Sequence, residues 1–187
     1  MNSEQAQKNM IDSQIKTWDV FGARIIEVFE KISREKFVPN EFRELAFADC
    51  ELDLGNNFKM NSPKLDARIL QAVDPQPCDN VLEIGTGTGF LTALLSNLSN
   101  VVYSIEIDKE IYEKAQNIIK KHGYSNIRLF HRDGLQGHSE KAPFDIIIVS
   151  ASSPSRLLTL EKQLAEGGRM LIFINETGVT TTKLISR

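Results

Sequence analysis

The chain has 187 residues, 41% of them hydrophobic and 25% charged, a composition typical of one soluble globular domain with a buried core. Its formal net charge of −3 gives no reason to expect a nucleic acid or an anionic membrane as partner, and no stretch approaches the ~18 apolar residues of a membrane span. The polar N-terminus lacks a signal peptide's apolar region, and Cys50 and Cys78 lack metal or disulfide spacing, so we expect a cytoplasmic protein.

Residues 1–79 have the pattern of a helical region. Apolar residues at three-to-four spacing predict a first amphipathic helix, namely Ile25, Ile26, Phe29 and Ile32. Pro39 interrupts the chain after this helix, and Asn40 is expected to cap a short helix. After the polar stretch LGNNFKMN, Ser62 and Pro63 predict the cap and the first residue of another helix.

From residue 80 onward, strand and helix patterns alternate. Strands are predicted at NVLEIG, VVYSIEI, IRLFHRD, FDIIIVSA and RMLIFI, and helices at FLTALLSNL, KEIYEKAQNIIKKHG and SRLLTLEKQLAEGG. This alternation predicts an α/β fold, a Rossmann-like, doubly wound, mostly parallel sheet with helices on both faces. The final NETGVTTTKLISR is expected to add a short antiparallel strand. We therefore expect a single domain with a helical substrate-side region at 1–79 and a cofactor-binding core at 80–187.

The segment VLEIGTGTGF has three glycines at alternate positions, Gly85, Gly87 and Gly89, where a strand turns into a helix. Residues without a Cβ atom let the backbone turn tightly and approach a ligand. A P-loop needs a lysine and a Ser/Thr after its last glycine, whereas Phe90 follows here, and a dinucleotide fingerprint needs a different glycine spacing. The Glu83 carboxylate would repel a pyrophosphate but suits the amine and sulfonium of S-adenosyl-L-methionine. This compound is the predicted cofactor.

Acidic residues follow the next two predicted strands. Glu106 lies 21 residues after Gly85 and ends the second strand, where a carboxylate can accept hydrogen bonds from ribose hydroxyls. Asp133 and Gly134 end the third strand, where the Asp133 carboxylate can accept from an adenine amino group, although Asp-Gly is also an ordinary turn sequence. Ribose and adenine sites are therefore predicted at these positions.

The segments VLEIGTGTGFLTALLS, VVYSIEID, HRDG, FDIIIVSAS and LAEGGRMLIFI resemble, in order, the motifs of class I S-adenosylmethionine-dependent methyltransferases. The segments MIDSQI, KISREKFVP and LAFADCELDLG are similar to the protein-L-isoaspartate O-methyltransferase family, and the resemblance spans nearly the whole chain. It implies a cofactor site that also includes Thr86, Ile107 and Ser150. It also implies methyl transfer to the carboxylate of L-isoaspartyl or D-aspartyl residues in damaged proteins, which is a repair reaction.

The same resemblance implies a Ser/Thr-Gln-Pro sequence with an active-site hydroxyl before the helix that precedes the glycine loop. This chain has Asn61-Ser62-Pro63 instead, so Asn61 lies where the hydroxyl is expected. Asn61 and Ser62 are the catalytic candidates: the Asn61 amide can donate to a substrate carboxylate, whereas Ser62 is better placed as a helix cap. A carboxylate is already ionised at neutral pH, so the reaction needs positioning groups and no general base.

Three alternatives stay open on the sequence. One is a methyltransferase-fold protein that binds the cofactor but has changed its substrate or lost catalysis. Another is a non-catalytic module that binds S-adenosylmethionine or a nucleotide. The third is a nicotinamide-dependent dehydrogenase, which Glu83 and the glycine spacing disfavour.

Overall fold

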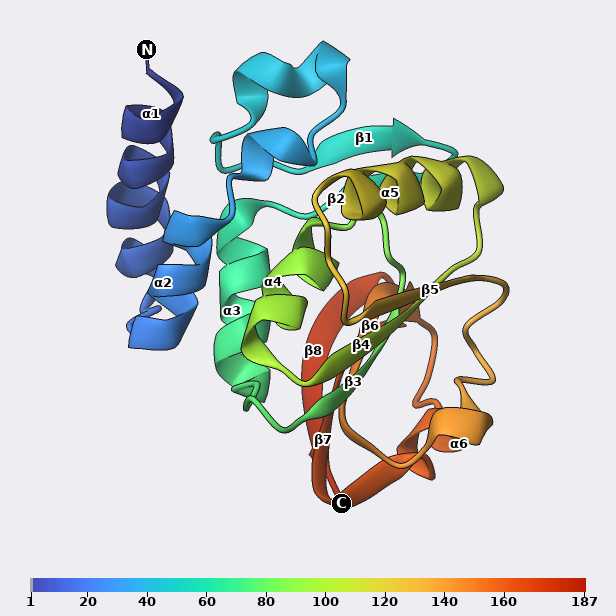
Figure 1. The fold of residues 1–187 in the computed structure, drawn as a ribbon. Helices are drawn as coiled ribbons and strands as arrows, with labels where there is room; N and C mark the ends of the chain where they lie inside the picture. Colours follow the sequence, from blue (N-terminus) through green and yellow to red (C-terminus); the bar gives the residue numbers. More distant parts are fainter. Residues whose placement is uncertain (1) are drawn as a thin grey trace.

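The computed structural model describes residues 2–187, in which N-terminal helices lead into an alternating α/β region (Figure 1). The helices are α1 (Ser3–Met10), α2 (Ala23–Lys31), α3 (Pro63–Val73), α4 (Phe90–Leu98), α5 (Lys109–Lys121) and α6 (Leu158–Glu161). The strands are β1 (Leu52–Gly55), β2 (Phe58–Met60), β3 (Asn80–Ile84), β4 (Val101–Glu106), β5 (Ile127–His131), β6 (Phe144–Ser153), β7 (Leu164–Glu176) and β8 (Val179–Ser186). Within residues 2–187, every helix is too short or too polar to cross a lipid bilayer.

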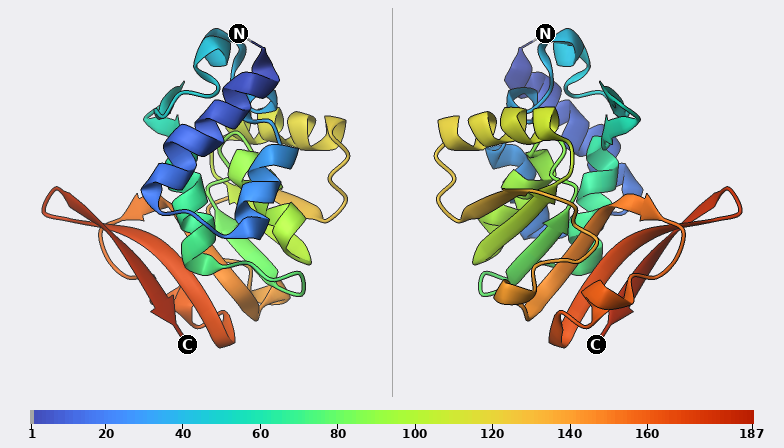
Figure 2. Two further views of the ribbon diagram at one scale, coloured as in Figure 1. Left: turned by 90° about the vertical axis from the view of Figure 1, so that its left-hand side faces the viewer. Right: turned by 90° about the vertical axis from the view of Figure 1, so that its right-hand side faces the viewer.

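Six strands form the main sheet, in the order β5-β4-β3-β6-β7-β8. All neighbouring strands run parallel except β8, which pairs antiparallel with β7. The β7–β8 hairpin extends sideways beyond the other strands (Figure 2). The predicted α/β fold, with a mostly parallel sheet and an antiparallel C-terminal strand, is confirmed.

The two faces of the sheet are covered by different parts of the chain. On one face, Val81 and Val102 pack in a core that includes helices α2, α3 and α4 and also Ile119 of α5. On the other face, Leu82 packs in a second core with Leu160 of α6. The first core contains residues from before and after residue 80, so the N-terminal helices and the α/β region share one interior.

The helix predicted over residues 155–168 is wrong over most of its length. Only α6 is helical there, and Leu164 already pairs with Phe144 in the ladder between β6 and β7. Leu160 and Leu164 are four residues apart, as in a helix, and both are buried in the same core. Their spacing fits a helix, but an extended chain from residue 164 onward completes the main-chain hydrogen bonds of β6. One short helix therefore lies on this face where a long one was predicted.

The polar stretch LGNNFKMN forms most of an unpredicted hairpin. Strands β1 and β2 pair antiparallel, and Asn56 and Asn57 turn between them with φ angles of 52° and 64°. Asparagine tolerates this left-handed conformation better than most residues, so the two asparagines are the turn signal. The expected cap at Asn40 is also wrong, because the 3₁₀ turn there begins after Pro39 without a side-chain cap from the described residues.

Arg169 of β7 joins the end of α3 to the sheet. Its guanidinium donates to the carbonyl oxygens of Val73 and Asp74 and to the Asp79 carboxylate, the last at 2.9 Å. Asp79 is buried, so solvent screens this ion pair only weakly. Because Val73 is the last residue of α3, these bonds hold the C-terminal end of the helix against β7.

Candidate active site

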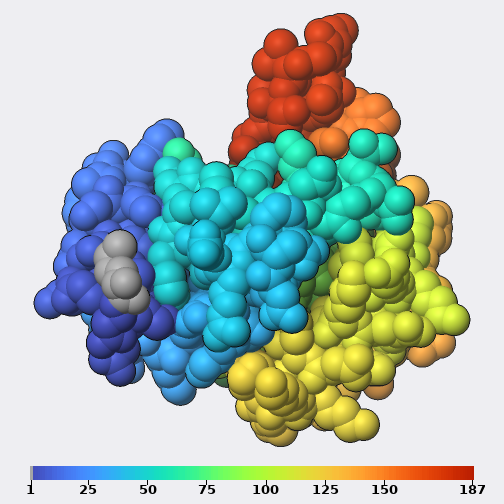
Figure 3. All heavy atoms as spheres, turned by 90° about the horizontal axis from the view of Figure 1, so that it is seen from above, coloured from blue at the N-terminus to red at the C-terminus, as the bar shows by residue number. Residues whose placement is uncertain are grey.

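A cleft of about 900 Å³ opens at the carboxyl ends of β3, β4 and β6, the edge of a parallel sheet at which ligands usually bind. The loop from β3 to α4 forms the floor, and the β1–β2 hairpin with the first turn of α3 forms a wall. Figure 3 shows this hairpin (teal) between the C-terminal hairpin (red) and α5 (yellow). The cleft therefore joins the region before residue 80 to the α/β core.

The glycine loop forms the floor of the cleft with main-chain atoms. Gly85 has a φ of +97°, its N–H donates to Ile105 O at 2.8 Å, and a Cβ atom there would lie 3.4 Å from the Ser150 Cβ. Only glycine takes this conformation without strain and keeps the loop close to Ser150. Thr86 and Gly87 continue the floor, and the Thr86 hydroxyl points into the protein, 2.6 Å from the Ser104 Oγ.

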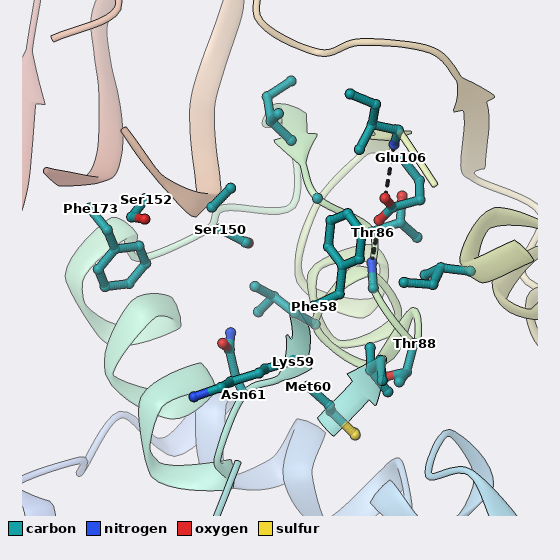
Figure 4. A pocket seen from close by; sticks show the side chains of 18 of the residues that line it. Phe58, Lys59, Met60, Asn61, Thr86, Thr88, Glu106, Ser150, Ser152 and Phe173 are labelled. Carbon is teal, nitrogen blue, oxygen red and sulfur yellow. Dashed lines mark hydrogen bonds between the residues drawn. The ribbon is translucent and has the colours of Figure 1, made fainter. Parts of the chain in front are cut away.

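Glu106 is held at the end of β4 by main-chain donors. Its Oε2 accepts from the Gly87 N–H at 2.9 Å, and its Oε1 accepts from the N–H groups of Ile107 and Asp108 at 2.8 and 3.0 Å (Figure 4). A carboxylate has about four acceptor positions, and three are used here. Glu106 lines the cleft with capacity for one further donor, whereas the sequence predicted acceptance from two ribose hydroxyls.

Glu83 does not lie where the sequence predicted, because it is fully buried beneath the glycine loop. Its Oε2 accepts from Ser104 Oγ and from Thr92 Oγ1, both at 2.6 Å. Alternate side chains of a strand share a face, so Glu83 points with Val81 toward α4 and away from the cleft. Burial raises the pKa of Glu83 to about 8. Glu83 therefore does not line the cleft, and the predicted contact between Glu83 and the cofactor's positive groups is wrong.

Gly89 and Ser62 are also outside the cleft. Gly89 precedes α4 with a φ of +83°, and a Cβ atom there would lie 3.2 Å from the Ile119 side chain, so its role is helix packing. Ser62 is buried at the start of α3, where its carbonyl accepts from the N–H groups of Leu65 and Asp66. The Ser62 hydroxyl makes no cap bond within the described chain, so the predicted side-chain cap is wrong although the helix begins as predicted.

Where residues after β4 and β5 line the cleft, apolar walls lie beside a carboxylate. Ile107 and Leu135 both line it, and the two residues are 56% and 49% exposed, so both offer apolar surface to a ligand. Asp133, two residues before Leu135, is exposed, and its Oδ1 accepts from the Leu135 N–H at 2.9 Å. The other Asp133 oxygen can accept from a ligand. A flat apolar ring with an amino group fits this combination.

Gly134 closes the floor at this end. A Cβ atom at Gly134 would lie 2.5 Å from the Ile84 Cγ2 and 3.0 Å from its Cδ1. We expect Gly134→Ala to lower the free energy of unfolding by about 1–3 kcal/mol, because overpacking forces a buried side chain off its rotamer. Urea unfolding measures this loss. Gly22→Ala is the control, because the atom nearest to its methyl group lies 3.2 Å away, at the end of the Ile25 side chain. Equal losses in both variants contradict the prediction.

Asn61 also lines the cleft, and Figure 4 shows it well separated from Glu106. Its Nδ2 donates to the Asp66 Oδ1 at 2.8 Å. Ser150 lines the same space from β6, and its buried Oγ has no hydrogen-bond partner among residues 2–187. A buried hydroxyl without a partner is costly, so a bound ligand is the natural source of its missing hydrogen bond.

Several residues of the cleft carried no signal in the sequence analysis. Asp66 occupies the first turn of α3, where it reads as an ordinary helix residue. The others lie on the unpredicted hairpin and the C-terminal strands, and they are Phe58, Met60, Phe173, Thr180 and Thr182. The Asn56–Asn57 turn could have revealed the hairpin, but no local pattern places it over the end of a sheet.

Comparison with known proteins supports the family suggested by these features. The family model for protein-L-isoaspartate(D-aspartate) O-methyltransferases matches residues 4–187. The chain belongs to this family. Relatives named protein-L-isoaspartate O-methyltransferase include one from Myxococcus xanthus, 39% identical over 158 residues, which cover 84% of this chain and 74% of that protein. One from Koribacter versatilis is 39% identical over 163 residues, with 87% and 73% covered.

Solved structures agree with the family. A protein-L-isoaspartate O-methyltransferase superposes with a TM-score of 0.82 at 28% identity over 97% of this chain, although the chain spans 59% of that protein. A structure titled as a putative protein-L-isoaspartate O-methyltransferase from Plasmodium falciparum in complex with S-adenosyl-L-homocysteine superposes with a TM-score of 0.81. At 20% identity over 100% of this chain and 90% of that one, it supports the fold alone.

Proposed function

We propose that this protein uses S-adenosyl-L-methionine to methylate the free carboxylate of L-isoaspartyl or D-aspartyl residues in damaged proteins, a repair reaction. The observation that carries the proposal is the shared cleft, in which the glycine loop and Glu106 face the Asn61 amide of the N-terminal region. Family membership supports this reaction over a fold that binds the cofactor without it. The cysteines Cys50 and Cys78 are both free, which suits a reducing cytoplasm.

The residues present fit the cofactor at three points. The exposed Ile107 and Leu135 flank the end of the cleft that suits adenine, with Asp133 beside them to accept from its amino group. Glu106 has one acceptor position left for a ribose hydroxyl. The main chain at Gly85 and the Ser150 side chain, which line the same cleft, would hold the methionine part. When bound, the cofactor supplies an electrophilic methyl group on its sulfonium.

The chain itself positions the substrate and excludes water. The substrate carboxylate is ionised at neutral pH, so no residue has to remove a proton from it. The Asn61 N–H that does not face Asp66 is proposed to bind this carboxylate. Phe58 of the hairpin and Phe173 of β7 add apolar surface to the same space (Figure 4). Catalysis then depends mainly on the orientation of the reacting oxygen.

The test is methyl transfer from radiolabelled S-adenosylmethionine to an isoaspartyl peptide, with the matched aspartyl peptide as control. We expect transfer to the isoaspartyl peptide alone, together with binding of S-adenosylhomocysteine and none of NADH. Cofactor binding without transfer to either peptide overturns the proposed substrate. Tighter binding of NADH overturns the proposed cofactor.

Replacing Asn61 with alanine is expected to raise the KM for the isoaspartyl peptide about tenfold, because one hydrogen bond to a charged group is lost. Activity should persist, since the reaction needs no proton transfer from this residue. Steady-state kinetics with the peptide measures the change, and S-adenosylhomocysteine affinity should stay within twofold. Ser62→Ala is the matched control, because its buried hydroxyl lies outside the cleft. An unchanged KM in Asn61→Ala removes Asn61 from the substrate site.

A further inference from the structure

A buried polar cluster of Arg34, Asn61 and Asp66 lies at the substrate end of the cleft, outside the glycine loop. Arg34 is fully buried although it is an arginine. Its Nη1 donates to the Ala46 carbonyl at 2.8 Å and its Nη2 to the Asn61 carbonyl at 2.7 Å. The guanidinium therefore holds the main chain of Asn61, which lies between β2 and α3.

Asp66 holds the side chain of the same residue. It is 2% exposed and accepts from the Asn61 Nδ2 at 2.8 Å. An ionised carboxylate only accepts hydrogen bonds, so it requires the nitrogen end of the amide to face it. This interaction fixes which way the amide group is turned. One Asn61 N–H is then bound to Asp66, and the second is left for the cleft.

Burying a carboxylate costs free energy unless it is paired. Burial raises the pKa of Asp66 to about 6, and the Asn61 hydrogen bond and the positive charge of Arg34 oppose this rise. The desolvated side chains of Arg34 and Asp66 both act on Asn61, one through its main chain and one through its side chain. Two buried charged side chains that both hold one half-buried amide indicate that the direction of this amide matters.

We propose that Asp66 and Arg34 are positioning residues that aim one Asn61 N–H at the substrate carboxylate, with Asp66 setting the orientation of the amide and Arg34 the place of its main chain. This inference rests on the proposed function. The Asn61–Asp66 pair thus provides a directed N–H donor. A hydroxyl can rotate its hydrogen freely, whereas an amide needs a partner to fix its orientation.

The kinetic test compares Asp66→Ala in the native chain and in the Asn61→Ala chain. We expect Asp66→Ala to raise the peptide KM about tenfold in the native chain and less than twofold when Asn61 is already alanine. Asp66→Asn should recover most of the loss, because its Oδ1 can still accept from the Asn61 amide. A KM effect of equal size in both backgrounds, or no effect in either, overturns the inference.

A second readout does not depend on turnover. In ¹⁵N NMR spectra, Asp66→Ala should shift the Asn61 side-chain amide resonances, which the Asn61→Ala spectrum identifies. Asp79→Ala is the matched control, since it also removes a buried aspartate but one that lies outside the cleft. If the protein methylates no isoaspartyl peptide but the amide resonances shift, only the proposed function fails. Asn61 resonances that are insensitive to Asp66→Ala overturn the inference itself.

Discussion

Replacing Glu106 with alanine is expected to weaken S-adenosylhomocysteine binding about 100-fold, the largest loss for any single residue of the cleft. The Glu106 carboxylate accepts from the main-chain N–H groups of Gly87, Ile107 and Asp108. Without it, three donors around the loop lose their acceptor and the ligand loses a ribose contact. Each lost hydrogen bond to a charged group costs about 1.5–3 kcal/mol, and 100-fold corresponds to about 2.8 kcal/mol.

Isothermal titration calorimetry with S-adenosylhomocysteine measures the loss at Glu106. Glu106→Gln keeps the size of the side chain but turns an amide N–H toward main-chain donors, so we expect an intermediate loss of about tenfold. Glu110→Ala is the control, because Glu110 is exposed on α5 and outside the cleft. A dissociation constant within threefold of the native value in Glu106→Ala shows that Glu106 does not bind the cofactor.

The second large effect concerns stability and pH, through Glu83. Burial raises the pKa of Glu83 from 4.5 to about 8. Between these values the folded chain keeps a proton that the unfolded chain has released, so the free energy of unfolding falls as pH rises. The contribution of Glu83 is fully present below about pH 4.5 and is lost as pH rises through 8. Each unit of pKa difference corresponds to about 1.4 kcal/mol. Asp66 acts in the same direction between pH 3.8 and about 6.

Glu83→Gln should remove most of this dependence, because glutamine is neutral throughout and its carbonyl can accept from Thr92 and Ser104. At pH 8.5 we expect the variant to exceed the native protein in free energy of unfolding by about 1–3 kcal/mol, since it no longer buries a charge. Urea unfolding at pH 6 and 8.5 measures this difference. Glu176→Gln is the control, because Glu176 is exposed at the end of β7. An identical pH dependence in native protein and Glu83→Gln contradicts the assignment of the proton to Glu83.

Local patterns in the sequence predicted the α/β core well. Strands such as FDIIIVSA are buried on both faces, and helices such as KEIYEKAQNIIKKHG have one apolar face, so each element has its own signature. The residues at the ends of these strands, among them Gly85, Glu106 and Asp133, consequently line the cleft as expected. Parallel strands bring their carboxyl ends to one edge, which makes this part of the site predictable.

The other parts of the fold and the site depend on the direction in which side chains point and on long-range packing. Successive residues of a strand face opposite sides of the sheet, so Glu83 and its neighbour Leu82 point in opposite directions. This period of two in β3 could have placed Glu83 toward α4. Asp66 is different, because it is only five residues from Asn61, but the tertiary structure is needed to bring it near Arg34. The segment around Leu164 suits a helix as well as a strand until the neighbouring strand β6 is known. Pairing across the sheet overrides local preference there.

The bonds from Arg169 to the end of α3 have a consequence for the substrate site. An α-helix is stiff, and α3, with 11 residues, is roughly 16 Å long. Its last turn is fastened to β7, and its first turn carries Asp66 beside Asn61. The helix thus acts as a spacer of fixed length between the sheet and the Asn61 amide that is proposed to bind the substrate. A substitution of Arg169 would therefore alter the alignment of the substrate from a distance, although Arg169 itself does not contact the substrate.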